Sequence, residues 1–184
     1  SLRFSGEKLP TIKSFDTSGN VILMSSFSKT ISPGMRVALC CGNAELIRKM
    51  TIAKQSADTH SPNLNQAIIA EYLSRDLLPE HIAEISKVYA HSASVMVEAM
   101  EEYFPDWVEY EKPIGGLFIW CTLPEGWDAS ELFKKAVARK VAFVPGVSFF
   151  TTSGKGNNTY RLNFSPEPEE RNRNGIRTRG ELRK

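Results

Sequence analysis

A lysine placed among hydroxyl and guanidinium groups is the part of the sequence best suited to chemistry. Lys29 follows Ser26 and Ser28, and Arg36 lies seven residues after the lysine. A lysine amine attacks an aldehyde to form a Schiff base only in its neutral form, which desolvation or a cationic neighbour favours. Serine hydroxyls and the planar arginine fork bind phosphate oxygens. The segment therefore predicts a site for an aldehyde that carries a phosphate group.

Apolar runs flank this segment on both sides. Residues 21–24 precede it and residues 37–41 follow it. Such runs predict two buried strands, so the lysine is expected at the end of a strand, where α/β proteins commonly bind ligands. Judged by residue types alone, roughly one lysine in ten in a serine-rich loop of this kind is catalytic, and the others are solvated surface residues.

Longer segments of the sequence resemble a known family. Residues 26–36, with the sequence SFSKTISPGMR, are similar to the cofactor-lysine segment of class I/II aminotransferases, the fold-type I enzymes that use pyridoxal 5'-phosphate. The resemblance implies that Lys29 carries the Schiff base with this cofactor and shuttles a proton during transamination. It also implies that Ser26, Ser28 and Arg36 hold the cofactor phosphate.

The resemblance continues along most of the chain. Residues 54–55 and 58–66 are similar to the segment after the lysine loop in the branch of aromatic-acid, aminoadipate and branched-chain type transaminases. Residues 113–120 and 141–146 resemble the small-domain strands of that branch, in the same order. The substrate stays open among these three classes of amino acid, because many residues that set specificity are expected outside this chain.

A second candidate site residue lies near the end of the chain. Alternation over residues 158–165 predicts a short strand whose polar face carries Arg161. Its apolar face is formed by Tyr160, Leu162 and Phe164. The resemblance implies that Arg161 grips the substrate α-carboxylate through two parallel hydrogen bonds. Without the resemblance, a surface ion pair would be favoured about three to one.

Some of the family's cofactor contacts are expected before the first residue. In the family, an aspartate for the pyridine nitrogen and a tyrosine three residues later stand just upstream of a Leu-Arg-Phe stretch, which here is residues 2–4. The glycine-rich phosphate loop, the ring-stacking aromatic and the asparagine beside the cofactor oxygen are expected upstream as well. We therefore expect this chain to be the C-terminal part of a longer enzyme and to be inactive as a fragment. Intact enzymes of the family are homodimers, so the same is expected of the longer enzyme.

The predicted fold is α/β, the C-terminal portion of a fold-type I transferase. Residues 1–80 are expected to be the remnant of the large cofactor-binding domain, at the end of its mainly parallel sheet. Residues 81–184 are expected to form a long linking helix and a small α/β domain.

Helix signals divide the chain further. Asn43 can cap a first helix, a second is expected over residues 63–77, and a third from Pro79 to about residue 104. The inward stripe of the third helix is expected to be core packing and comprises Ile82, Ile85, Tyr89, Ser92, Met96, Ala99 and Tyr103.

The rest of the chain reads as short strands and two helices. Strands are expected over residues 108–110, 117–122 and 141–144, and a helix over residues 128–139 with Asp128 in a capping box. The tail, residues 166–184, is expected to form a short or frayed helix, because two glycines interrupt it and it carries few large aliphatic residues.

Composition agrees with a cytoplasmic globular protein. The 184 residues are 41% hydrophobic and 24% charged with a formal net charge of +2, which gives no reason to invoke nucleic acid or an anionic membrane as a partner. The longest apolar runs are far shorter than the roughly twenty residues of a membrane helix. Cys40, Cys41 and Cys121 lack metal-ligand spacing and are expected to be buried reduced thiols.

Two alternatives to an enzyme remain open on these observations. One is the aminotransferase-like, effector-binding domain of a winged-helix transcription regulator. The other is an inactive fragment that lacks half of the cofactor site, in which truncated strands would expose apolar edges and promote aggregation.

Overall fold

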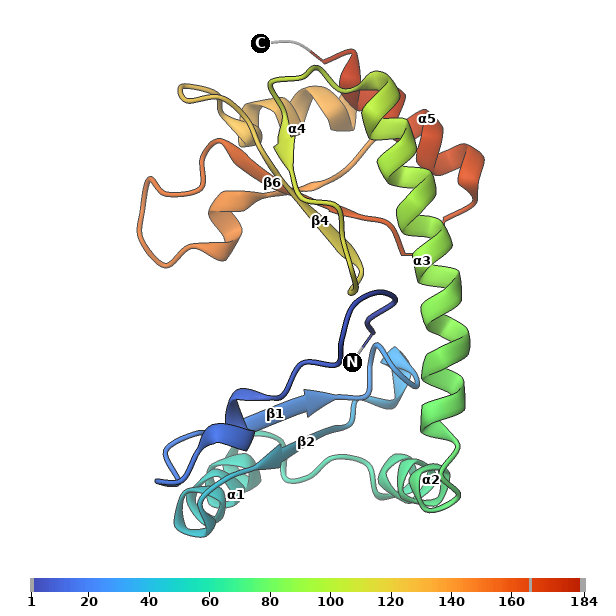
Figure 1. Cartoon of the computed structure of the whole chain (residues 1–184). Coiled ribbons are helices and arrows are strands. Elements are labelled where there is room, and N and C mark those ends of the chain that lie inside the picture. The colour runs from blue at the N-terminus through green and yellow to red at the C-terminus, as the bar shows by residue number, and fades with distance from the viewer. Residues whose placement is uncertain (1, 166, 183–184) are drawn as a thin grey trace. The chain divides into compact units, whose positions relative to one another are not determined.

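The computed structural model describes residues 2–165 and 167–182, and the chain divides into two compact units (Figure 1). The first unit is Glu7–Glu84, and the second is Ile85–Lys184 together with Ser1–Gly6. The boundary that the sequence suggests between residues 80 and 81 stays a prediction for the whole protein.

The first unit is built from one β-hairpin and helices. Its elements are η1 (Ile12–Phe15), β1 (Leu23–Ser26), η2 (Pro33–Met35), β2 (Ala38–Cys41), α1 (Ala44–Asp58) and α2 (Asn63–Ser74). The two strands pair antiparallel, with Ser26 opposite Ala38. Residues 27–37 connect them without an α-helix, and antiparallel strands can be joined by such a short connection whereas parallel strands need a long crossover.

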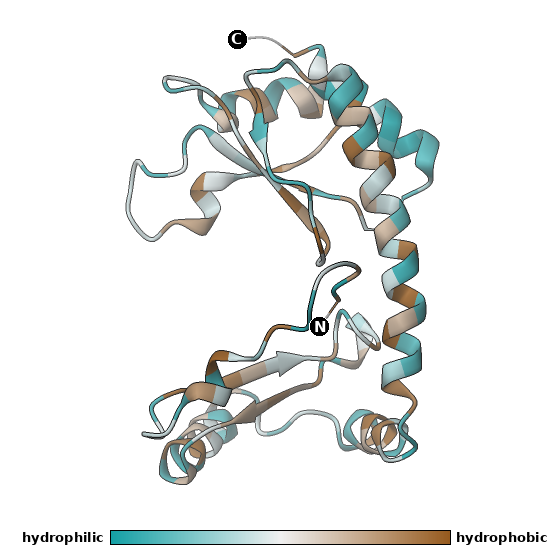
Figure 2. Ribbon diagram, viewed as in Figure 1, coloured by the Kyte–Doolittle hydropathy of each residue, from teal (hydrophilic) through white to brown (hydrophobic). Residues whose placement is uncertain are grey.

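The prediction that these two strands are buried was wrong. Met24 on β1 is 71% exposed, and every residue of β2 is exposed. Figure 2 shows β2 as apolar along its length. Cys40 and Cys41 share this exposure, which also contradicts the prediction of buried thiols there. The reason is that no second layer covers the hairpin within its unit, so an apolar run does not by itself produce burial.

Helix ends in this unit follow the local signals. Asn43 caps α1 as predicted, because its side-chain oxygen accepts hydrogen bonds from the backbone N–H groups of Glu45 at 3.0 Å and Leu46 at 3.4 Å. The second helix ends at Ser74, three residues earlier than predicted. Asp76 adopts a left-handed φ of 53°, which terminates the helix before the apolar residues that follow.

Helix α3 (Leu78–Tyr103) has the predicted length. From Ile85 onward it belongs to the second unit and contributes to that unit's core. Of the predicted stripe, Met96 and Ala99 are buried, and Tyr89 and Tyr103 pack against the core while partly exposed. The buried surface is wider than that stripe, and its residues are Ser86, Ala93, Val95, Met96, Val97, Ala99 and Met100.

The second unit places three helices against a four-stranded antiparallel sheet. The strand order is β3-β4-β6-β5. The strands are β3 (Glu109–Tyr110), β4 (Phe118–Thr122), β5 (Val144–Pro145) and β6 (Thr159–Asn163), and the other elements are α4 (Ala129–Ala138), η3 (Gly146–Phe149) and α5 (Glu169–Gly180). The strand expected over residues 141–144 starts later, at Val144, directly after the buried Phe143. The α/β class is as predicted, although every strand pair among the described residues is antiparallel.

The alternation predicted for β6 is confirmed. Tyr160 and Phe164 have no exposed surface and Leu162 is 5% exposed, whereas Asn163 faces solvent. Asp128 caps α4 as predicted, with its side-chain oxygen accepting from the N–H groups of Ser130 and Glu131.

The C-terminal helix is longer and better packed than its sequence suggested. Helix α5 runs for 12 residues and buries Ile176, and Leu182 beyond its end is also buried. A side chain at Gly180 would overlap the backbone oxygen of Tyr103, so this glycine allows α5 to approach the end of α3 closely. The prediction of a short or frayed helix was therefore wrong. Residues 166, 183 and 184 of the predicted tail lie outside the described residues.

Arg179 on α5 is a buried charge. Its side chain has no exposed surface, and none of its three guanidinium nitrogens has a hydrogen bond of acceptable geometry to a described residue. The guanidinium carbon lies 4.7 Å from the ring centroid of Tyr160 and 5.4 Å from that of Phe104. Ring faces offset only part of the cost of removing a charge from water.

Replacing Arg179 by methionine is expected to raise the free energy of unfolding by about 1–4 kcal/mol, because the change removes a buried charge without a counterion. Urea unfolding followed by circular dichroism measures the change, and the denaturant slope should stay constant. Arg177→Met is the matched control, since Arg177 is exposed on the same helix, and its effect should stay within about 0.5 kcal/mol. A less stable Arg179→Met protein would contradict the assignment of an uncompensated charge.

Within the described ranges, no helix combines the length and the apolar character that crossing a lipid bilayer requires.

Candidate functional site

Phe27 organises the loop that carries the candidate lysine. Its side chain is buried against Val37 and Ile69 in the small core of the first unit. Its backbone N–H donates to the carbonyl oxygen of Val37 at 3.1 Å, which closes the loop at the base of the hairpin. Its carbonyl oxygen accepts hydrogen bonds from three consecutive backbone N–H groups, those of Thr30, Ile31 and Ser32. The loop is therefore a compact turn around one buried residue.

The three predicted phosphate-binding residues are brought together by this turn. Ser26 Oγ donates to Ser28 Oγ at 3.0 Å, and the backbone N–H of Ser28 donates to Ser26 Oγ at 3.2 Å. Arg36 Nη1 lies 3.4 Å from Ser28 Oγ and 3.3 Å from the carbonyl oxygen of Pro33. Ser28 Oγ, exposed or half-exposed like its two neighbours, thus lies within hydrogen-bonding distance of both the Ser26 hydroxyl and the Arg36 guanidinium.

The backbone of Arg36 adopts a conformation that is costly for an arginine. Its φ and ψ are 54° and 37°, in the left-handed region that glycine and asparagine occupy more readily. This conformation costs an ordinary residue about 1–2 kcal/mol. The carbonyl oxygen of the preceding residue, Met35, accepts a hydrogen bond of 2.9 Å from the side chain of Asn65 on α2. That contact holds the strained segment in place, and strain of this kind is frequent at ligand sites.

Lys29 lies at the exposed side of the same turn. It makes no hydrogen bond or ion pair with any residue in the described ranges, and its side chain is exposed. Its amine is therefore sterically accessible to a reactive carbonyl group beside Ser26, Ser28 and Arg36.

Arg161 belongs to the second unit, whereas Lys29 belongs to the first. On β6 it stands directly opposite Trp120 of β4. Its side chain has neither a hydrogen bond nor an ion pair with another described residue, and its Nε atom is buried without a partner. A guanidinium of this kind is available to an external carboxylate.

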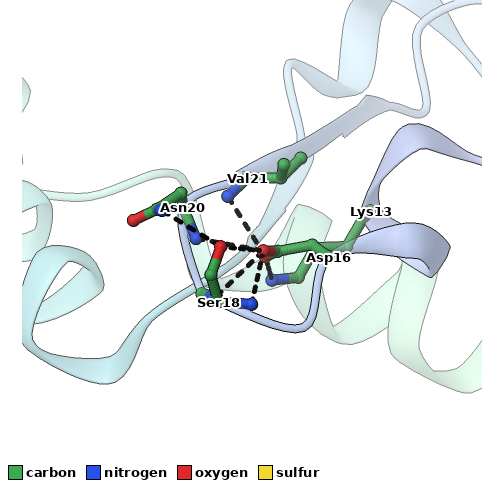
Figure 3. Close-up of polar contacts among 6 residues, drawn as sticks. Lys13, Asp16, Ser18, Asn20 and Val21 are labelled. Atoms are coloured by element: carbon green, nitrogen blue, oxygen red, sulfur yellow. Dashed lines mark hydrogen bonds and ion pairs between the residues drawn. The ribbon is translucent and has the colours of Figure 1, made fainter.

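Sequence reasoning missed Asp16, which builds the approach to β1 (Figure 3). One carboxylate oxygen accepts hydrogen bonds from the backbone N–H groups of Ser18, Gly19 and Asn20. The other accepts from the N–H of Val21 at 3.1 Å and from Lys13 Nζ at 2.7 Å. The sequence contained a signal for this turn, because an aspartate before Thr-Ser-Gly-Asn is typical of an Asx turn. The turn fixes the entry into the strand that ends at Ser26.

These contacts determine the charge state of Asp16. The hydrogen bond from Lys13, aided by the backbone N–H groups of Val21 and Asn20, outweighs burial and holds the pKa of the Asp16 carboxyl well below its ordinary value of 3.8. Because the folded pKa is the lower one, the carboxylate stabilises the fold fully above the ordinary pKa, and this stabilisation is lost as the pH falls below it.

We expect the amides of Gly19 and Val21 to lose protection against hydrogen exchange, corrected for intrinsic rates, as the pH falls below about 4. In Asp16→Asn, protection should already be low at neutral pH and should no longer depend on pH in this range. NMR-detected exchange measures both effects. Asp58→Asn is the control, since it removes only an exposed ion pair on α1 and should leave these amides unchanged. Equal protection in Asp16→Asn and the unmodified protein would contradict this role.

Two other candidate sites, a reactive Cys121 thiol and a metal site, find no support among the described residues. Burial raises the pKa of the Cys121 thiol to about 12, which keeps it protonated and unreactive. In the part of the chain that the structure describes, no three His, Cys, Asp or Glu side chains are grouped as metal ligands.

Comparison with known proteins supports the resemblance read from the sequence. A family model described as aminotransferase class I and II matches residues 4–177. The chain is 43% identical over 176 residues to aromatic-amino-acid aminotransferase 1 of Thermococcus litoralis, covering 96% of this chain and 42% of that relative. The chain therefore belongs to the aminotransferase class I and II family. It spans only about two fifths of the length of such curated relatives.

Solved structures support the same fold. A multiple substrate aminotransferase from Thermococcus profundus matches with a TM-score of 0.90 and 46% identity, over 96% of this chain and 43% of that one. A Pyrococcus horikoshii kynurenine aminotransferase, solved in complex with PMP, matches with a TM-score of 0.91 and 40% identity, over 96% and 44% of the two chains. These matches confirm the prediction of an α/β fold that corresponds to part of a fold-type I enzyme.

A transcription regulator also matches this chain in sequence. The HTH-type transcriptional regulator YisV of Bacillus subtilis is 31% identical over 160 residues, which cover 86% of this chain and 32% of the regulator.

Proposed function

We propose that this chain is the lysine-bearing part of an aminotransferase that uses pyridoxal 5'-phosphate to move an amino group between an amino acid and a 2-oxo acid. The observation that carries the proposal is the turn around Phe27, in which an unpaired lysine stands beside two hydroxyls and a guanidinium. Family membership supports it, and because the chain spans 42% of the T. litoralis relative, the activity is assigned to a longer protein.

The side chains of the turn fit the phosphate group of this cofactor. Ser26 and Ser28 supply hydroxyl donors and Arg36 supplies a permanent positive charge with parallel N–H groups, so all three suit phosphate oxygens. In the described chain their polar atoms contact only one another and one carbonyl oxygen, so a phosphate has no carboxylate to displace.

The roles of the two reactive side chains follow from their chemistry. Bound pyridoxal phosphate supplies an electron sink for the electron pair left at the substrate Cα. Lys29 would hold the cofactor aldehyde through Nζ, and its neutral amine would take the proton from the substrate Cα as general base. Arg161 holds the substrate α-carboxylate and so fixes the direction in which the Cα–H bond points.

For the intact protein, we propose a homodimer in the cytoplasm.

Reductive trapping tests the cofactor site. After incubation with pyridoxal 5'-phosphate and reduction with borohydride, peptide mass spectrometry should place the added mass on Lys29. Lys29→Ala should lose this labelling, and Arg36→Ala should need roughly tenfold more cofactor for half-maximal labelling, because a charge-assisted phosphate contact is removed. Lys49 and Lys54 are internal controls, since both are exposed and both form ion pairs on α1.

Labelling spread equally over Lys29, Lys49 and Lys54 would contradict a specific site. Such a result would support the reading that the chain, taken alone, is an inactive fragment without a working cofactor site.

The match to YisV supports a second candidate, an effector-binding domain of a transcription regulator that uses the same cofactor site. The two candidates differ in the intact parent protein. Turnover of amino donors to 2-oxo acids favours the enzyme, whereas retention of promoter DNA on a gel without such turnover favours the regulator.

A further inference from the structure

Arg161 lies against two aromatic rings. Its guanidinium carbon is 3.8 Å from the ring centroid of Phe118 and 4.4 Å from that of Phe149. Both distances are well inside the roughly 6 Å at which a guanidinium is attracted to an aromatic face. The two rings come from different elements, since Phe118 begins β4 and Phe149 ends η3.

The fold fixes both rings. Phe118 is the diagonal cross-strand neighbour of Arg161, because Trp120 stands directly opposite Arg161 and side chains two residues apart share a face. Trp120 packs edge to face against Phe149, with ring centroids 5.4 Å apart. Gly146, at the start of η3, leaves no space for a side chain against Thr159 of β6. This close contact brings η3, and with it Phe149, onto the strand that carries Arg161.

The guanidinium is otherwise uncompensated. No acidic side chain in the described ranges pairs with Arg161, and its Nε atom is buried without a partner. Ring contacts restrict the rotation of the arginine without using its N–H groups, which point along the edge of the guanidinium plane. A bidentate contact with a carboxylate needs those N–H groups free and in a fixed direction.

We propose that Phe118 and Phe149 are positioning residues that clamp the guanidinium of Arg161 and so preorganise it for a carboxylate. The proposal rests on the function proposed above for Arg161. The clamp reduces the conformational entropy that the arginine side chain loses when it binds a carboxylate. The ring contacts also replace water that would otherwise hydrate the guanidinium. Neither ring is needed for the core, since Phe118 is 37% and Phe149 is 44% exposed.

The clamp is tested first without ligand. In NMR spectra, the Nε–Hε signal of Arg161 should carry the ring-current shift of a proton near aromatic faces, and Phe118→Leu and Phe149→Leu should each move it toward the position of a free arginine. Phe149→Tyr keeps the ring and should retain the shift. Phe150→Leu is the matched control, because Phe150 packs on Trp120 but has no stacking contact with Arg161. An unmoved signal in both leucine variants would overturn the clamp.

The consequence for binding is tested with phenylacetate, and phenylacetamide serves as the uncharged control. Each leucine variant should bind phenylacetate about fivefold more weakly, whereas Phe149→Tyr and Phe150→Leu should bind it as the unmodified chain does. If Arg161→Ala abolishes binding but the leucine variants do not weaken it, the positioning role is wrong while the role of Arg161 stands. If Arg161→Ala binds phenylacetate normally, both the role of Arg161 and the clamp as a carboxylate device are wrong.

Discussion

The carbonyl oxygen of Phe27 accepts three backbone hydrogen bonds, and the lysine loop depends on this arrangement. The three donors are consecutive, so they pull the chain into a tight turn directly after β1. Burial of the Phe27 ring against Val37 and Ile69 keeps the turn attached to the unit. As a result, residues eight positions apart in the sequence, Ser28 and Arg36, face each other across the turn. The polar groups are exposed, and the structure that holds them is apolar and backbone-based.

Local signals in the sequence were sufficient wherever neighbouring residues alone decide the structure. Asn43 and Asp128 mark the starts of their helices because a cap needs only the two or three N–H groups that follow it. Alternation around Tyr160 gave both the strand and the face on which Arg161 lies. The proximity of Ser26, Ser28 and Arg36 could also be predicted, because the segment that brings them together is only eleven residues long.

Features that depend on distant contacts were not predictable in this way. The apolar runs around the loop predicted the strands correctly but not their exposure. Burial requires a covering layer, which an apolar run does not specify. The environment of a charged side chain was not predictable from the sequence either, as Asp16 and Arg179 show. The carboxylate is nearly enclosed and satisfied by its own turn, whereas the guanidinium lies near the rings of Phe104, Phe143 and Tyr160 from three other segments and is left unpaired. Residue type alone does not distinguish these two outcomes.

Arg36 combines a guanidinium with a left-handed backbone, and these two properties favour different residues. The backbone alone would select glycine or asparagine, whereas a phosphate contact requires the long cationic side chain. Procedures that choose residues for conformational stability would therefore favour replacing this arginine, and with the role proposed for Arg36 the resulting protein would be more stable to heat but would bind phosphate less well. For engineering of this chain, position 36 should therefore be held fixed, and added thermal tolerance should be sought elsewhere.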